Sequence, residues 1–239
     1  MPATVAAPTP INRLLAAVTK RNLGPILKTC EEVELTFGDV LSEPDEPIRY
    51  VYFPTTSFIS LITPNGASES LEVGLVGNEG VFGITLVLGI DASPLKGLVQ
   101  GAGQAMRMSV THFRRASRES PSFGRVVHAY LYVLMAQIAQ TAACGRFHQL
   151  EARLARWILM THDRAGSDTF PLTHVFLAQM LGVRRAGVTE AAGLVQKRGF
   201  IQYRRGIVQV LNRPGLEEIA CPCYDAFNAM YYKHLGGSH

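Results

Sequence analysis

The segment Leu177–Ile201 constrains the fold more than any other part of the chain. It carries a small residue at Ala178, a glycine at Gly182 and an apolar residue at Val188, at successive offsets of four and six. A small residue lets a second helix cross the first closely, a glycine accepts a turn with positive φ, and an apolar residue fixes the second helix against the first. The spacing therefore predicts a helix-turn-helix.

The positions expected to face outwards at the start of the second helix are all polar: Arg184, Arg185, Thr189 and Glu190. The first residues of a recognition helix reach base edges in the major groove of DNA. An ordinary helical hairpin with two exposed arginines would give the same three-position match, because alanine and glycine are common. Three further features favour a DNA-binding motif.

The first feature is a hairpin pattern after the motif. Apolar and polar residues alternate from Phe200 to Leu211 on both sides of Arg204-Arg205-Gly206, which predicts two strands joined by a tight turn. The turn would present Arg204 and Arg205 to a phosphate backbone, where such contacts set register and affinity. Thr173, just before the motif, completes the expected set of DNA contacts.

The second feature is the charge distribution, and the third is the position of the motif. Residues 146–213 hold eleven Arg or Lys and four Asp or Glu, whereas residues 31–91 hold one basic and eleven acidic residues. The basic charge is therefore concentrated where the motif lies, as an electrostatic footprint on DNA requires. The motif also follows an N-terminal domain of a different kind, as the DNA-binding domain of a regulator would.

Length and composition bound the organisation of the chain. A chain of 239 residues with 47% hydrophobic and 18% charged residues can form packed domains. We expect a flexible leader over 1–20, a β-rich sensor domain over 21–118, a helix over 119–148 and a winged helix-turn-helix domain over 149–239. No apolar run reaches the roughly 18 residues of a membrane span. The N-terminus does not read as a signal peptide, so a cytoplasmic protein without a membrane partner is expected.

The N-terminal half is predicted to be mainly β-structure. Short segments with strand patterns are separated by Gly, Pro, Asn and Asp turns, which is typical of a sandwich or barrel. The expected strands are Val33–Phe37, Ile48–Phe53, Ser57–Ile62, Glu69–Leu75 and Gln104–Met108.

A long helix is expected to follow the β-rich part. Ser120-Pro121 marks its start, and the stretch from Phe123 to His148 has no proline and a wide apolar arc. At 1.5 Å per residue it would run about 37 Å, more than one small domain covers. We expect a second copy of the chain to pack on it. The alternative is a helix buried within one chain. An amphipathic helix, Gln149–Asp163, is expected next.

This order of elements resembles the Crp/Fnr family of bacterial transcription regulators. The segment Gly77–Gly83 and the triplet Tyr52-Phe53-Pro54 are also similar to that family. The resemblance implies an α+β fold with a jelly-roll, cyclic-nucleotide-binding-like sensor, a long dimerisation helix and a C-terminal winged helix-turn-helix. It also implies a homodimer that binds a palindromic promoter site on double-stranded DNA and contacts RNA polymerase, and not an enzyme.

Within this resemblance, Arg185 falls where the family places a base-reading arginine, which can bond guanine O6 and N7 together. The family's commonest next readers are a glutamate and an arginine, and here those positions hold Ala186 and Glu190. The half-site should therefore differ from the best-known one, with Arg184 and Thr189 as further contacts.

The sensor departs from the cyclic-nucleotide binders of the family. Those proteins carry Gly-Glu-Leu and, about ten residues on, Arg-Ser, whereas this chain has Gly83-Ile84-Thr85 and then Ser93, with Lys96 as the nearest base. A cyclic nucleotide would leave its phosphate charge unpaired, which is costly. We expect no cyclic-AMP binding by the usual mode, and these five residues mark the candidate pocket for an unknown effector.

The cysteines and histidines argue against a resident cofactor. Cys30 and Cys144 are too few for the iron–sulfur branch, and residues 31–110 contain no histidine, which disfavours haem and a cupin-like metal enzyme. Cys221 and Cys223 with His234 could bind a metal or act as a thiol switch, but a Cys-x-Cys pair supplies only two ligands. They are expected to be incidental thiols in a C-terminal helix, Cys221–Leu235. A redox- or partner-controlled module that uses this pair, with DNA binding secondary, is the alternative function.

Overall fold

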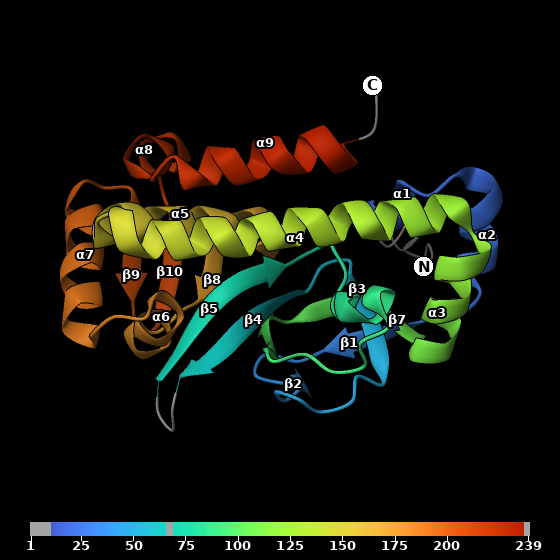
Figure 1. Cartoon of the computed structure of the whole chain (residues 1–239). Coiled ribbons are helices and arrows are strands. Elements are labelled where there is room, and N and C mark those ends of the chain that lie inside the picture. Colours follow the sequence, from blue (N-terminus) through green and yellow to red (C-terminus); the bar gives the residue numbers. More distant parts are fainter. Residues whose placement is uncertain (1–10, 66–68, 237–239) are drawn as a thin grey trace, which may run out of the picture.

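The computed structural model describes residues 11–65 and 69–236, and a long helix, α4 (Pro121–Phe147), runs along one side of the whole molecule (Figure 1). The strands of the N-terminal half lie beneath α4 toward its beginning. The elements of the C-terminal half gather toward its end. This matches the expected order of sensor, long helix and C-terminal domain.

The N-terminal half forms two antiparallel sheets, which confirms the predicted β-rich sensor. The three-stranded sheet has the order β1-β7-β3 and the four-stranded sheet the order β2-β6-β4-β5. The strands are β1 (Cys30–Leu35), β2 (Val40–Ser42), β3 (Tyr50–Pro54), β4 (Phe58–Asn65), β5 (Glu69–Val76), β6 (Lys96–Gly101) and β7 (Gly103–Ser109). The sequence did not predict β2, which has three residues, or β6, whose glycines hide its alternation.

Those glycines let aromatic rings fill the space between the sheets. The ring of Phe82 lies over Gly97, and a Cβ at that glycine would come within 2.3 Å of it. Phe58 covers Gly101 in the same way. Phe53, Phe58 and Phe82 are all buried, so large side chains occupy the interior of the sensor.

Two short helices, α1 (Arg13–Ala16) and α2 (Lys20–Leu27), precede the first strand. Asn12 is fully buried and caps α1, and its amide donates to the carbonyls of Pro54 (2.8 Å) and Gly80 (2.9 Å). Leu14 and Leu15 are also buried. Residues 11–20 therefore pack on the sensor and are not part of the flexible leader expected over 1–20, of which residues 1–10 lie outside the described residues. The Pro- and Ala-rich composition hid a short apolar segment with its own cap.

The helices that follow the sheets position the C-terminal half. The 3₁₀ turn η1 (Ile84–Leu88) and α3 (Val110–Glu119), neither of them predicted, lead to α4. Helix α4 begins where the sequence predicts, because Ser120 accepts from the Phe123 N–H (3.3 Å) and Pro121 occupies the first turn. Helix α9 (Cys223–Leu235) packs beside α4 and runs back along it (Figure 1).

The C-terminal half contains the predicted helix-turn-helix and hairpin. Its other elements are the predicted helix α5 and the unpredicted β8 and α8, and its sheet has the order β8-β10-β9. The elements are α5 (Leu150–Ala165), β8 (Thr169–Pro171), α6 (His174–Leu181), α7 (Arg185–Lys197), β9 (Ile201–Arg204), β10 (Ile207–Val210) and α8 (Arg213–Ile219).

Candidate nucleic-acid interface

The residues that define the motif perform the roles that their spacing predicts. Thr173 caps α6, its Oγ1 accepting from the Phe176 N–H (3.1 Å). Gly182 ends α6 in the left-handed region, with φ of 62°. Ala178 and Val188 are buried between the two helices. Helix α7 therefore crosses α6 with its apolar face covered.

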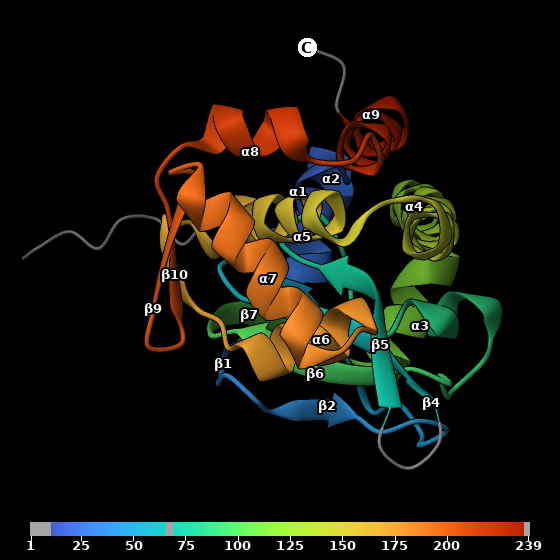
Figure 2. The same cartoon turned by 90° about the vertical axis from the view of Figure 1, so that its left-hand side faces the viewer.

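The opposite face of α7 is open. Arg184, Arg185, Thr189 and Glu190 are all exposed in its first turns. Figure 2 looks onto this helix, with the β9–β10 hairpin beside it. The structure thus brings together on one exposed helix end the four residues that the sequence singled out there.

One of the four is held by its neighbours. The Thr189 hydroxyl donates to the Arg185 carbonyl (3.1 Å) and lies 3.0 Å from His174 Nδ1. Burial and the nearby Arg185 guanidinium lower the pKa of His174. A neutral His174 therefore positions Thr189 without adding charge to the interface.

The hairpin ends in the tight turn expected of a wing. Arg205 and Gly206 both have positive φ, 50° and 77°, as a two-residue turn of this kind requires. Arg204 and Arg205 are exposed. Arginine in this backbone region is uncommon, and such positions cluster at functional sites.

Contacts of Tyr203 hold the hairpin against the motif. Its hydroxyl donates to the Leu172 carbonyl (2.5 Å), its N–H donates to Gln196 Oε1 on α7 (2.7 Å), and its ring stacks on His174 with centroids 4.3 Å apart. The wing tip and α7 are therefore fixed relative to each other. No local sequence pattern indicated this role for Tyr203.

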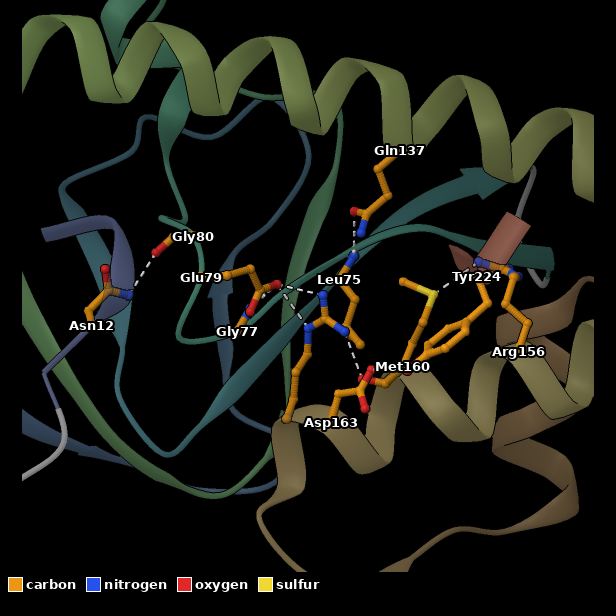
Figure 3. A network of polar contacts seen from close by, with 11 residues as sticks. Asn12, Leu75, Gly77, Glu79, Gly80, Gln137, Arg156, Met160, Asp163 and Tyr224 are labelled. Carbon is orange, nitrogen blue, oxygen red and sulfur yellow. Dashed lines mark hydrogen bonds and ion pairs between the residues drawn. The ribbon is translucent and has the colours of Figure 1, made fainter. Parts of the chain in front are cut away.

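A buried ion pair joins the sensor to the C-terminal half. Arg164, on α5, donates from Nη2 (2.5 Å) and Nε (2.9 Å) to Oε1 of Glu79, and from Nη1 to the Met160 carbonyl (2.7 Å). Glu79 also accepts from the Gly77 N–H (3.2 Å). Figure 3 shows Glu79 facing α5 in this network. Sequence analysis singled out Gly77–Gly83 only as a family-like segment and missed its partner.

A second contact crosses the same boundary. The indole N–H of Trp157, on α5, donates to Glu72 of β5 (2.9 Å), and the other carboxylate oxygen of Glu72 lies 2.7 Å from the Ser60 hydroxyl. Burial raises the pKa of Glu72 to about 7. The acidic N-terminal half and the basic C-terminal half are thus joined by one ion pair, Glu79–Arg164, and by a hydrogen bond from a neutral indole.

The five residues marked as an effector pocket do not line the cavity between β5, α4, α5 and α6 that is described below. Lys96 Nζ pairs with Glu43 (2.9 Å), and Ser93 Oγ accepts from the Leu95 N–H (3.1 Å). Gly83 is the left-handed cap of η1, followed by the buried Ile84; the Oγ1 of Thr85 is also buried. A cavity of about 380 Å³ lies instead between β5, α4, α5 and α6, with Glu72, Gln137, Arg156 and Trp157 in its lining.

The cysteines are arranged differently from the expectation. Cys144, at the end of α4, meets Cys221 and Cys223, at the start of α9, together with His148. The Cys221–Cys223 pair, expected to be incidental, thus lies beside a third cysteine and a histidine. His234 is not the partner of the Cys221–Cys223 pair, because its ring packs on the ring of Tyr132, with centroids 4.9 Å apart. The four-residue spacing of Cys144 and His148, which puts both on one helix face, was the missed signal.

Comparison with known proteins identifies the domain that contains this geometry. The family described as the Crp-like helix-turn-helix domain matches residues 152–219, which span α5 to α8. This part of the chain is thus a Crp-like helix-turn-helix domain. No curated protein matches the sequence of the chain.

Solved structures share the fold over most of the chain. FixK2 from Bradyrhizobium japonicum is 14% identical, with a TM-score of 0.66 over 80% of this chain and 98% of its own. The c-di-GMP responsive global regulator CLP from Xanthomonas campestris is 13% identical, with a TM-score of 0.65 over 80% of this chain and 99% of its own. TTHA1359, a CRP/FNR regulator from Thermus thermophilus, is 21% identical, with a TM-score of 0.63 over 80% of this chain and 98% of its own. At these identities the likeness establishes the fold.

Proposed function

We propose that this protein is a transcription regulator of the Crp/Fnr family, a cytoplasmic homodimer that binds a palindromic promoter site through two copies of α7 and contacts RNA polymerase. The proposal divides the chain at residues 118 and 148 into sensor, dimerisation helix and DNA-binding domain. The observation that carries it is the exposed N-terminal end of α7, where Arg184 and Arg185 lie open beside a wing that Tyr203 holds in place.

Each exposed residue has a distinct role in this proposal. Arg185, the first residue of α7, reads guanine through O6 and N7, and Arg184, Thr189 and Glu190 contact neighbouring bases. Arg204 and Arg205 bind phosphate at the wing tip. Thr173 Oγ1 accepts from the Phe176 N–H, so its hydroxyl proton is free to reach a phosphate oxygen.

The dimer would form on the exposed face of α4. Among the described residues, α4 is the one helix long and apolar enough to cross a membrane by length and composition, and 28% of its most apolar window is buried. Seven of its exposed positions repeat at alternating intervals of three and four, the spacing found along the seam of a two-helix coiled coil. They are Arg125, His128, Tyr132, Met135, Ala139, Ala142 and Arg146. Small residues in the middle and arginines at both ends suit a second copy of the helix in water better than lipid.

The sensor in this proposal does not take cyclic AMP by the usual mode. Lys96, the nearest base in the sequence to the position of the family's phosphate-binding arginine, already pairs with Glu43 (2.9 Å). The same dimer is compatible with control by a small-molecule effector. The alternative function is a redox- or partner-controlled module that uses Cys221 and Cys223, with DNA binding secondary.

A binding series with matched variants tests the proposal. Fragments of a bacterial genome bound by the purified protein at about 150 mM salt supply a site. Affinity for that site and for a scrambled duplex is then measured against salt. The expected selectivity is roughly 10³-fold or more. Arg185→Ala should reduce the difference in binding free energy between the two duplexes by about 1–3 kcal/mol. Arg205→Ala should weaken both duplexes alike and reduce the salt slope.

Arg198→Ala is the matched control. Arg198 follows the last residue of α7 and pairs with Glu151 (3.2 Å), away from the proposed reading end. The Arg198→Ala variant should prefer the selected duplex over the scrambled one as strongly as the wild type does. Loss of selectivity with Arg198→Ala but not with Arg185→Ala would overturn the assignment of the reading end.

A further inference from the structure

Three cysteines and one histidine converge where α4 ends and α9 begins. The Sγ atoms of Cys144 and Cys221 are 3.4 Å apart, and Cys223 Sγ is 3.4 Å from His148 Nδ1. One ligand atom from each of the four residues lies within 4.8 Å of all the others. The three cysteines are buried and His148 is half-buried. Residues 77 positions apart in the chain are thus brought into one cluster.

The spacing of these atoms fits a tetrahedral metal ion. Zinc–sulfur and zinc–nitrogen bonds of about 2.3 and 2.0 Å place neighbouring ligand atoms about 3.5–3.8 Å apart in a tetrahedron. The Cys144–Cys221 and Cys223–His148 contacts, both 3.4 Å, lie just below this range, and any separation near the 4.8 Å limit needs small rotations of side chains. A disulfide would join two of the three sulfurs at about 2.05 Å and leave the third sulfur and the imidazole without a role.

The surroundings of the cluster favour thiolates. Gln140 donates from Nε2 to Cys223 Sγ (3.0 Å), an outer hydrogen bond of the kind that orients metal ligands. Cys223 is the first residue of α9, where the helix dipole stabilises negative charge. Arg156 is 8% exposed, and its Nε has no hydrogen-bond partner among the described residues. Three thiolates and a neutral imidazole on Zn²⁺ would carry one negative charge, which the guanidinium of Arg156 would balance.

The backbone also supports a built site. The Cys221 N–H donates to the Ala152 carbonyl of α5 (3.3 Å), and the Tyr224 N–H donates to the Cys221 carbonyl (3.1 Å), so the Cys221–Cys223 segment is fixed before α9 starts. His148 is the cap residue that ends α4. The four ligands therefore come from backbone whose position other contacts already determine.

We propose that Cys144, His148, Cys221 and Cys223 bind one Zn²⁺ ion, which fastens the end of the long helix to the start of the C-terminal helix. Binding releases the three thiol protons to solvent and changes no oxidation state. The site lies at the junction between α4 and α5, so it fixes the path by which the chain passes from the long helix into the DNA-binding domain. This proposal does not depend on which DNA site the protein reads.

The first test is the metal content of the full chain, purified without chelator and measured by mass spectrometry. The wild type should carry about one zinc per chain. Cys144→Ser and Cys221→Ser should lower this value severalfold or more. Cys30→Ser is the control, because Cys30 lies on β1, away from the cluster, and its zinc content should equal that of the wild type.

A second test uses the wild type alone, so that it does not depend on the folding of variants. Cobalt added to the metal-free protein should give the visible bands of tetrahedral Co²⁺ and a thiolate charge-transfer band, both saturating at one equivalent and displaced by zinc. Absence of both zinc and these bands would overturn the proposal. So would a Cys144–Cys221 disulfide found by peptide mapping of protein isolated without oxygen, or zinc that Cys221→Ser leaves in place.

Discussion

The buried ion pair between Glu79 and Arg164 should hold the sensor and the DNA-binding domain together. The two side chains are 9% and 5% exposed, so solvent screens them little. Arg164→Met leaves the Glu79 carboxylate buried with the Gly77 N–H as its remaining donor (3.2 Å). Breaking a buried pair by removing one partner costs about 3–5 kcal/mol, because the charge that is left loses its compensation. We therefore expect a loss of about that size in the free energy of unfolding.

Urea unfolding followed by tryptophan fluorescence measures this loss. Trp157 is the chain's one tryptophan and lies on α5 at the same boundary, so its emission reports on this junction. Glu79→Gln with Arg164→Met should be less destabilising than the sum of the two single changes, by about 1–3 kcal/mol. The matched control is Glu43→Gln, which breaks the exposed pair with Lys96 and should change stability by about 1 kcal/mol or less. Additive effects in the double variant, or a loss of less than about 1 kcal/mol with Arg164→Met, would refute the reasoning.

Other parts of the molecule lead to three more predictions. The pKa of Glu72 is raised from 4.5 to about 7, so the folded protein holds a proton that the unfolded chain releases and stability falls as pH rises through that window. Glu72→Gln should remove this slope, a difference of up to about 3 kcal/mol between pH 4.5 and pH 8 in urea titrations; an unchanged slope would disprove the assignment. Tyr203→Phe should cost about 1 kcal/mol in thermal unfolding, since it deletes the bond to the Leu172 carbonyl, and a neutral effect would argue against that bond. Ala139→Glu puts like charges together at the proposed seam of α4 and should shift the protein toward monomer in analytical ultracentrifugation, whereas an unchanged mass would place any dimer contact elsewhere.

The sequence predicted best those elements whose local pattern agrees with the fold. The helix-turn-helix follows from Ala178, Gly182 and Val188 because each residue acts within a few positions of the others. The wing follows from alternation around Arg205-Gly206, and the long helix from its cap at Ser120. In each case the stabilising contacts are local, so a single sequence contains them.

Features that depend on distant contacts could not be predicted in the same way. Asn12 looked like part of a leader, although its amide is buried between Pro54 and Gly80. The contact of Cys144 with Cys221 and Cys223 was not predicted, because those two cysteines lie beyond the whole DNA-binding motif. The cap of α8 at Asn212, which accepts from the Gly215 N–H (2.9 Å), was a local signal that sequence analysis overlooked.

The sequence of the DNA that the protein selects tests the account most directly. Fragments bound by the ligand-free wild type are sequenced beside those bound by Arg185→Ala at the same salt concentration. The account predicts one inverted repeat for the wild type, with half-site centres about 10 base pairs apart, and loss of that motif for the variant. Fragments without a shared sequence, recovered in equal amounts with both proteins, would contradict it.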